Sequence, residues 1–297
     1  MYKRILLLVG LITQFFSVSL MAQPAEKSAS KLPNSLLWKI SGKGLNKPSY
    51  LFGTIHMICN QDYFFNQTMK DALLGCEKLL LEINLSDPNT VAQYQQSMML
   101  PAGKELKNFF KDEAEYEAFS QKLKTHIGID ASLFQNLKPL ILLSLIAQKS
   151  FECENTASYE MNLLELSKEH HMSVAGLETS LAQMKIFDDM KDEEIKKILL
   201  EGIEDIEKDN KMQDQMVLAY KNQQIEQLHD IILSSKEFQH QEDALINNRN
   251  KDWVEKLPVL MKESSCFVAV GAGHLAGKQG VIQLLRDKGY EVVAVNN

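Results

Sequence analysis

A near-repeated Gly-x-x-His motif is the clearest chemical feature of the sequence. Gly53–His56 (GTIH) and Gly271–His274 (GAGH) each follow an apolar stretch typical of a β-strand. In open α/β sheets, ligands bind at the carboxyl ends of the strands. A glycine there lets the chain turn sharply, and a histidine can ligate a metal or act as a general base. We therefore predict that His56 and His274 face one site if their strands are neighbours.

Two glutamates end other apolar stretches. Glu82 follows Leu79–Leu81, and Glu178 follows Val174–Leu177. A carboxylate at the end of a buried strand is costly unless it is paired with a metal, an arginine or a proton. The alternative is that each glutamate merely caps the loop or helix that follows. For two histidines and two glutamates at four strand ends, we favour a shared polar site.

Three further polar residues are expected on helices. Glu160, Gln183 and Arg249 either support the shared site or lie on solvated helix faces. His126, His229 and His240 fall in polar helical segments and are predicted to be exposed.

The elements that must position these residues are those of an α/β protein. The chain has 297 residues, 45% of them apolar, which excludes disorder and collagen-like repeats. Hydrophobic periodicity predicts a hairpin (36–40, 49–52), a helix (63–76), a buried parallel strand (78–83), helices (88–149, 159–170), a strand (173–177), further helices (179–263), and strand, helix, strand (266–270, 277–288, 290–295).

The predicted architecture is a small mixed or parallel sheet built from N- and C-terminal segments. A large helical insertion, about 86–262, separates them within a single compact domain. The last three elements form a right-handed βαβ unit with a parallel pair. Leu140–Ala147 is strongly apolar but too short to span a bilayer, so we expect it to be a buried core helix.

The first residues are typical of a secretory signal peptide, which we assign to 1–22. Lys3 and Arg4 precede an apolar run that ends near Ala22. A flexible leader (23–34) and the α/β domain (35–297) follow. We expect export to the periplasm or the extracellular space, with contact to the membrane only through the signal sequence before cleavage.

Export affects how the four cysteines are interpreted, because an oxidising compartment permits disulfides. Cys76 and Cys266 lie in apolar contexts and are predicted to be buried thiols. Cys59 and Cys153 lie in polar, loop-like contexts and are the better candidates for a bridge. Spacing alone does not decide the pairing.

Charge and motifs exclude several other functions. The formal net charge of −7 argues against a nucleic-acid partner. The Gly271-x-Gly273-x-x-Ala276 spacing matches dinucleotide-binding loops, but the ribose-binding acid and further βαβ units do not follow it. The sequence also has no H-E-x-x-H or G-x-S-x-G motif of common zincins and serine hydrolases.

Taken in order, several segments resemble the TraB/GumN family, which includes the Tiki-type extracellular metalloproteases. The matching segments are 51–57 (LFGTIHM), 79–82 (LLLE), 176–179 (GLET) with Gln183, 248–250 (NRN) before Trp253, 270–275 (VGAGHL) and 280–292 (GVIQLLRDKGYEV). Each motif is short, but the ordered set covers nearly all of 36–295.

The resemblance implies a compact α/β domain with paired GxxH motifs at a divalent-metal site. Carried over by residue, it indicates His56, Glu82 and His274 as the metal centre, with Glu178 and Arg249 as close support. The metal would be manganese, cobalt or zinc. Glu160 stands where relatives often carry aspartate.

The sequence therefore favours an exported metal-dependent hydrolase that acts on peptides or proteins. Such a site would leave an open position for water, with Glu82 or Glu178 as general base and Arg249 steadying the oxyanion. The first alternative is a non-catalytic protein that sequesters a peptide or glycan in the same crevice. The second is an interaction scaffold built on the acidic helical insertion, which we also expect to set substrate selectivity.

Overall fold

The computed structural model describes residues 31–149, 151, 153–204, 206–234 and 241–296. The predicted signal peptide, most of the leader and His240 lie outside these residues. Residues 32–297 form one compact unit. Across the described ranges, no helix combines the length and the apolar character that a membrane crossing requires.

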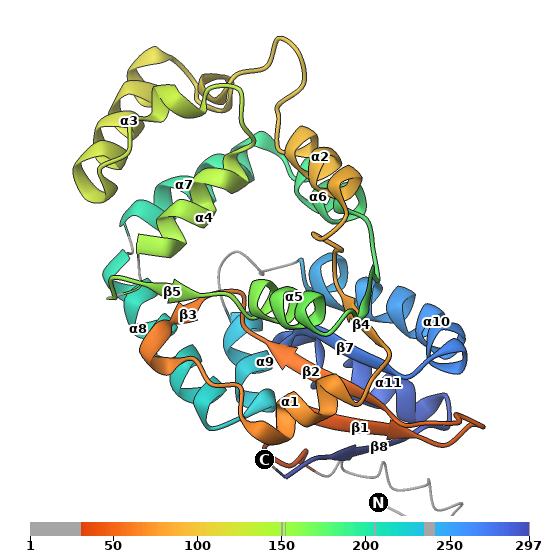
Figure 1. Ribbon diagram of the computed structural model, residues 1–297. Coiled ribbons are helices and arrows are strands. Elements are labelled where there is room, and N and C mark those ends of the chain that lie inside the picture. The colour runs from red at the N-terminus through yellow and green to blue at the C-terminus, as the bar shows by residue number, and fades with distance from the viewer. Residues whose placement is uncertain (1–30, 150, 152, 205, 235–240, 297) are drawn as a thin grey trace, which may run out of the picture. The chain divides into compact units, whose positions relative to one another are not determined.

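A six-stranded mixed sheet forms the centre of this unit (Figure 1). Its strand order is β6-β4-β7-β2-β1-β8. The strands are β1 (Leu37–Ser41), β2 (Ser49–Thr54), β4 (Lys78–Leu81), β6 (Ser173–Gly176), β7 (Cys266–Gly271) and β8 (Glu291–Ala294). A separate short ladder pairs β3 (Ile58–Cys59) with β5 (Thr156–Ala157). This arrangement confirms the predicted α/β class.

Four neighbouring strands, β6, β4, β7 and β2, run parallel to one another. The predicted hairpin is confirmed, since β1 pairs antiparallel with β2. The predicted parallel pair at the C-terminus is only partly right: β7 and β8 run in the same direction, but they are not neighbours, because β2 and β1 lie between them and β8 pairs antiparallel with β1. The strand-helix-strand pattern was correct, but sequence proximity does not specify which strand occupies the neighbouring position.

Helices pack on the sheet and, within the insertion, against one another. They are α1 (Gln67–Leu74), α2 (Pro88–Ser97), α3 (Glu113–Ile127), α4 (Pro139–Lys149), α5 (Tyr159–Glu169), α6 (Ser180–Asp188), α7 (Asp192–Glu204), α8 (Ile206–Lys221), α9 (Ile225–Ser234), α10 (Asn248–Glu263) and α11 (Val281–Asp287). Helix α1 begins later than predicted because the Asn66 side chain caps it, accepting from the Met69 amide. The insertion is also not purely helical, because β6 returns from it to the edge of the sheet.

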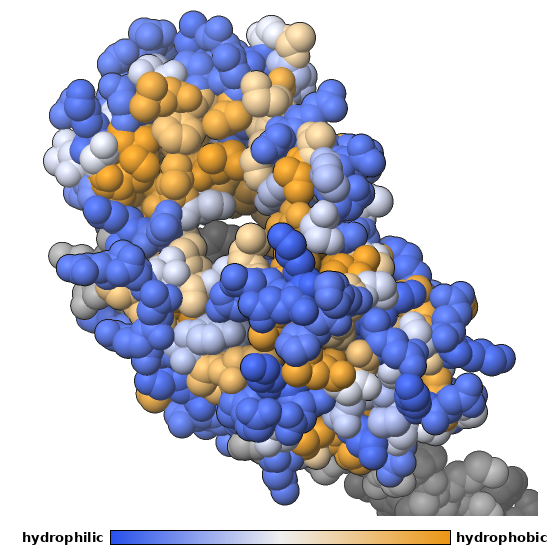
Figure 2. Space-filling view, in the orientation of Figure 1, coloured by the Kyte–Doolittle hydropathy of each residue, from blue (hydrophilic) through white to orange (hydrophobic). Residues whose placement is uncertain are grey.

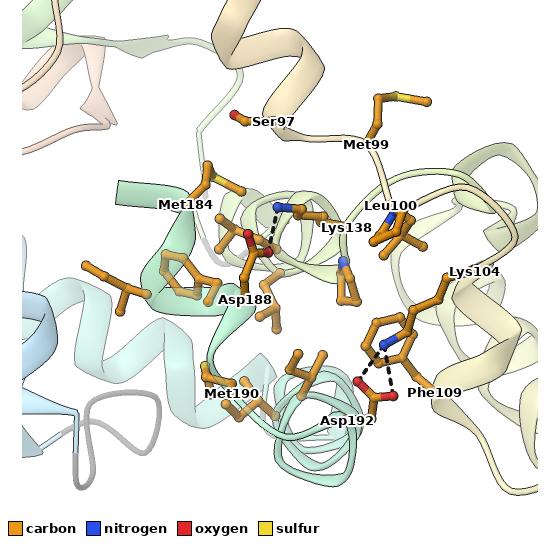
Figure 3. A pocket seen from close by; sticks show the side chains of 18 of the residues that line it. Ser97, Met99, Leu100, Lys104, Phe109, Lys138, Met184, Asp188, Met190 and Asp192 are labelled. Atoms are coloured by element: carbon orange, nitrogen blue, oxygen red, sulfur yellow. Dashed lines mark hydrogen bonds and ion pairs between the residues drawn. The ribbon is translucent and has the colours of Figure 1, made fainter. Parts of the chain in front are cut away.

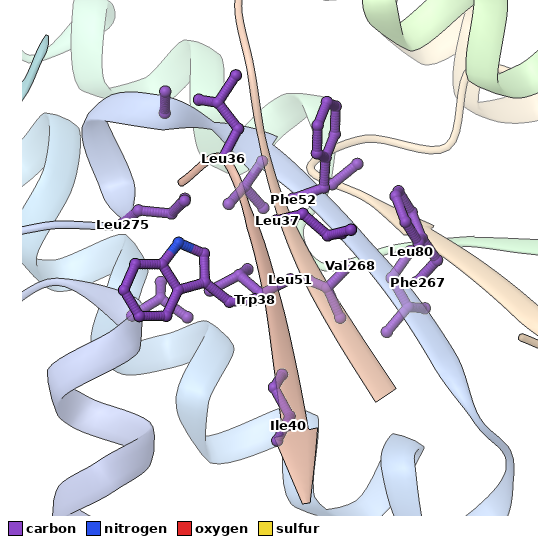
Figure 4. Packing of buried hydrophobic residues seen from close by; sticks show 14 of the residues in the cluster. Leu36, Leu37, Trp38, Ile40, Leu51, Phe52, Leu80, Phe267, Val268 and Leu275 are labelled. Carbon is purple, nitrogen blue, oxygen red and sulfur yellow. The ribbon is translucent and has the colours of Figure 1, made fainter. Parts of the chain in front are cut away.

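Two hydrophobic clusters stabilise the unit. The larger one packs around the sheet, with Trp38, Phe52 and Phe267 fully buried (Figure 4). The smaller one joins residues of α3, α4 and α7, among them Phe119, Leu142 and Leu199. The prediction of a buried helix at Leu140–Ala147 is only partly right. Leu142 and Ile146 are buried, whereas other residues of α4 are partly or fully exposed.

The cysteines behave as predicted. Cys59 and Cys153 form a disulfide across 94 residues, and Cys76 and Cys266 are buried free thiols. The bridge closes beside the β3–β5 ladder, in which Ile58 pairs with Ala157. It therefore ties the segment that follows the first GxxH motif to the segment that leads into α5.

Removing this disulfide is expected to lower the free energy of unfolding by about 2–4 kcal/mol, because the open chain gains conformational entropy when unfolded. Urea denaturation of Cys59→Ala/Cys153→Ala beside the wild type measures the loss. A reductant should destabilise the wild type by a similar amount and leave the double variant unchanged. Equal stability of wild type and variant would show that the bridge does not constrain the chain.

Candidate active site

The predicted strand-end residues converge at one edge of the sheet. Glu178, Glu82, His274 and His56 follow β6, β4, β7 and β2, which are consecutive parallel neighbours. Thr54 is in register with Gly271, and Leu81 with Gly176. The two GxxH strands, β2 and β7, are therefore neighbours, which is the condition under which we expected His56 and His274 to face one site. Parallel strands present their carboxyl ends at the same edge, which explains how residues far apart in sequence meet.

Arg249, on α10, lies at the centre of these side chains. Its Nε donates to both carboxylate oxygens of Glu178, and its Nη2 lies 2.5 Å from Glu82 Oε2 and 2.5 Å from Glu178 Oε1. Its Nη1 contacts the Leu245 carbonyl oxygen at 2.9 Å and His274 Nε2 at 3.1 Å. All five N–H groups of the guanidinium therefore have partners. The predicted oxyanion role stays a prediction, and it requires Arg249 to release one of them.

His274 is buried and held in one tautomer. Because Arg249 can only donate, His274 Nε2 must accept, and the ring proton is on Nδ1. That proton is donated to Asn250 Oδ1, at 2.6 Å, while Asn250 Nδ2 donates to the carbonyl oxygens of His274 and Gln279. Burial lowers the pKa of His274 to about 3. The imidazole is thus neutral at neutral pH, with its Nε2 lone pair directed into the cluster.

His56 lies on the open side of the site, with a side chain that is 73% exposed. Its Nδ1 is 3.1 Å from Glu160 Oε1, and the same oxygen accepts from the Thr54 hydroxyl at 2.7 Å. The hydrogen bond to Glu160 raises the pKa of His56 to about 9. Glu160, whose role the sequence left in doubt, is therefore the residue that orients His56.

The two central glutamates have opposite pKa shifts. Burial raises the pKa of Glu178. Burial also acts to raise the pKa of Glu82, but the charges of Arg249 and His56 and the hydrogen bond from the Gly271 amide lower it to about 2. The Gly271 N–H donates to Glu82 Oε1 at 2.8 Å. Gln183 Nε2 lies 3.3 Å from an oxygen of each glutamate and so links them.

The motif glycines serve close packing rather than a sharp turn, which corrects our expectation. The glycines with positive φ are others, such as Gly277. A Cβ on Gly53 would lie 3.0 Å from Leu275 Cδ2 and 3.2 Å from Ala272 Cα, so the two GxxH segments touch there. A Cβ on Gly271 would lie 3.4 Å from Glu82 Oε1. A side chain at Gly53 would therefore crowd the second GxxH segment, whereas a Cβ at Gly271 would make an ordinary contact with Glu82.

Sequence reasoning misjudged or missed several supporting residues. His229, predicted to be exposed, is partly buried, and its Nδ1 lies 2.8 Å from the Gly273 carbonyl oxygen. It thus packs against the second GxxH segment. Asn250, which the sequence indicates only as part of the NRN motif, is fully buried and fixes His274. An amide directly after Arg249 was the available signal.

The residue types fit a divalent metal. In the structure, however, these residues surround the positively charged guanidinium of Arg249. A neutral imidazole whose Nδ1–H is held by an amide oxygen is a usual metal ligand, and carboxylates complete such sets. Here, however, the Arg249 guanidinium contacts both Glu82 and His274. In the described part of the chain, no group of three or more His, Cys, Asp or Glu residues is arranged to hold a metal ion.

The protein is therefore an α/β protein in which two GxxH motifs and two glutamates follow neighbouring parallel strands. Comparison with known proteins places it further: the TraB/PrgY/gumN family model matches residues 36–294, so the chain belongs to that family.

Curated relatives are Tiki metalloproteases. Metalloprotease TIKI2 of Danio rerio is 21% identical over 319 residues, covering 87% of this chain and 60% of the relative. Metalloprotease TIKI1 of Danio rerio is 34% identical over 95 residues, or 32% of this chain and 18% of the relative. Metalloprotease TIKI1 of Homo sapiens is 36% identical over 76 residues, covering 25% of this chain and 14% of the relative. The chain thus matches at most 60% of the length of these three relatives. No solved structure matches.

Proposed function

We propose that this protein is an exported metal-dependent hydrolase that cleaves peptide bonds. The observation that carries the proposal is the convergence of His56, Glu82, Glu178 and His274 at four adjacent strand ends. The similarity of the chain to proteins named metalloproteases supports this reaction class. The proposed ligands are His56, His274 and Glu82, and the ion would be manganese, cobalt or zinc.

When bound, such an ion supplies Lewis-acid activation of water and of the scissile carbonyl. The chain's own residues prepare that chemistry. Asn250 keeps the His274 proton on Nδ1 and its lone pair on Nε2. Glu160 holds His56 Nδ1, so that His56 Nε2 is directed away from that carboxylate.

The two glutamates have different proposed roles. Glu82, ionised because its pKa is about 2, supplies a permanent negative charge. Glu178, whose pKa is raised by burial, is the better proton acceptor of the two and serves as general base. Arg249 holds both carboxylates in place and neutralises their mutual repulsion.

Chelation tests this function most simply. A chelator should abolish hydrolysis of a peptide library by the purified protein, and added manganese, cobalt or zinc should restore it. Peptide binding measured in parallel separates catalysis from sequestration. Peptide binding without cleavage, unaffected by chelator and by added metal, would contradict the proposal and favour a sequestering protein.

A further inference from the structure

A large apolar cavity lies among the helices of the insertion, apart from the strand-end residues. It encloses about 570 Å³ between α2, α4, α6 and α7 (Figure 3). Its wall includes Leu100, Phe109, Leu143, Met184 and Ile195. Hydrophobic residues also gather around a hollow in the upper part of Figure 2, where these helices lie. Cavities of roughly 300–1,000 Å³ with mainly apolar walls are typical of ligand sites.

The walls of the cavity can adapt to different side chains. Met99, Met184 and Met190 all line it. Methionine is unbranched and polarizable, so it fills irregular gaps and is favoured at surfaces that accept varied apolar partners. Met99 and Leu181 remain 44% and 57% exposed, which places them where the cavity meets solvent.

Four charged side chains that line the cavity form two Lys–Asp ion pairs. Lys138 Nζ lies 2.5 Å from Asp188 Oδ1, and Lys104 Nζ lies 2.7 Å from Asp192 Oδ1. Each ammonium group is therefore already neutralised by a carboxylate. A fatty acid brings a single anionic head and would have to displace an aspartate, whereas peptide main chain brings both N–H donors and C=O acceptors. The pairs therefore favour a peptide over an acyl chain.

Two segments are shared by the cavity and the candidate active site. On α6, Gln183 contacts Glu82 and Glu178, while the next residue, Met184, lines the cavity. Leu245 also lines the cavity, and its carbonyl oxygen accepts a hydrogen bond from Arg249. A ligand in the cavity would thus lie against the segments that hold the carboxylates and Arg249.

We propose that this cavity binds an apolar segment of the peptide substrate. The inference rests on the proposed peptidase function and deepens it. Substrates would carry hydrophobic side chains near the bond to be cleaved, and the helical insertion would select them through this cavity.

Fluorescence anisotropy with defined peptides tests the inference. The probe is fluorescein-labelled Gly-Leu-Val-Phe-Leu-Gly amide, beside a counterpart with a Ser-Asn-Gln-Ser core. Titrations use the full chain carrying His56→Ala, which prevents consumption of the probe. Met99→Glu/Leu181→Glu places charges where the cavity opens, at positions exposed enough to keep the fold. Leu133→Glu/Leu218→Glu is the matched control, since these residues are 77% and 61% exposed and do not line the cavity.

The wild-type cavity should bind the apolar peptide at least about tenfold more tightly than the polar one. The affinity for the apolar peptide should fall about tenfold in Met99→Glu/Leu181→Glu and change by less than about twofold in the control variant. Equal affinity in the cavity variant, or equal binding of the polar peptide, would overturn the inference. So would displacement of the probe by dodecanoate at lower concentration than by unlabelled peptide, which would assign an acyl chain.

Cleavage by the unsubstituted protein separates the two proposals. Cavity-dependent binding without cleavage would contradict the peptidase function and leave the cavity as a peptide site. Cleavage that does not depend on the cavity residues would leave the peptidase function and overturn the cavity assignment.

Discussion

Replacing Arg249 by leucine is expected to lower the free energy of unfolding by about 3–5 kcal/mol, because two buried carboxylates lose the cation that neutralises them. The side chains of Glu82, Glu178 and Arg249 are only 11%, 9% and 12% exposed. Among the residues that the structure describes, Glu82 would keep the Gly271 amide and Gln183 as direct hydrogen-bond partners. Urea denaturation followed by circular dichroism measures the effect.

A compensated variant separates charge from packing in this experiment. In Arg249→Leu/Glu82→Gln/Glu178→Gln the unpaired charges are gone, so most of the lost stability should return. Arg249→Lys keeps the positive charge but lacks the five N–H donors of the guanidinium. Its free energy of unfolding should therefore lie between those of the wild type and Arg249→Leu. If the triple variant is as unstable as Arg249→Leu, lost packing rather than charge explains the effect.

Replacing His56 by alanine is expected to reduce peptide turnover by more than about 100-fold while leaving the fold intact, because losing a ligand should cost more than the roughly 10–100-fold that losing a ligand's supporting partner costs. The side chain is 73% exposed, and it contacts Glu160, which would keep its hydrogen bonds to Thr54 and Ser158 in the variant. The expectation follows from the proposed role of His56 as a ligand. Steady-state turnover and circular dichroism measure activity and fold.

His126→Ala is the matched control for this variant, because His126 is also exposed but lies on α3 in the helical insertion. Its turnover should equal that of the wild type. Full turnover by His56→Ala would remove His56 from the mechanism and leave the reaction to the buried residues alone.

The convergence of the strand-end residues could be predicted from the sequence, whereas the order of the strands in the sheet could be predicted only in part. His56, Glu82, Glu178 and His274 end apolar strands, and a polar residue at such a position is a local signal. The position of β8 was missed because pairing depends on which edge of the sheet remains free, and this is a property of the whole fold. The antiparallel partner β1 lies more than 240 residues earlier in the chain, as the pairing of Trp38 with Ala294 shows.

Local patterns also missed contacts made by side chains across elements. His229 lies on α9, where apolar residues such as Leu228 and Ile232 accompany polar ones, and its ring is held by the Gly273 carbonyl oxygen. The strongly apolar segment Leu140–Ala147 of α4 was predicted to be a buried core helix, but Leu140 and Leu143 line the cavity instead. Hydrophobicity predicts removal from water and does not distinguish a packed core from the wall of a ligand cavity.

Metal content tests the central claim most directly. Purified protein, dialysed and analysed by elemental mass spectrometry beside His56→Ala/His274→Ala, should hold close to one metal ion per chain, and the double variant should hold none. Circular dichroism of both proteins checks that the variant is folded. Absence of metal from the wild type, even after loading with manganese, cobalt and zinc, would contradict a metal-dependent hydrolase.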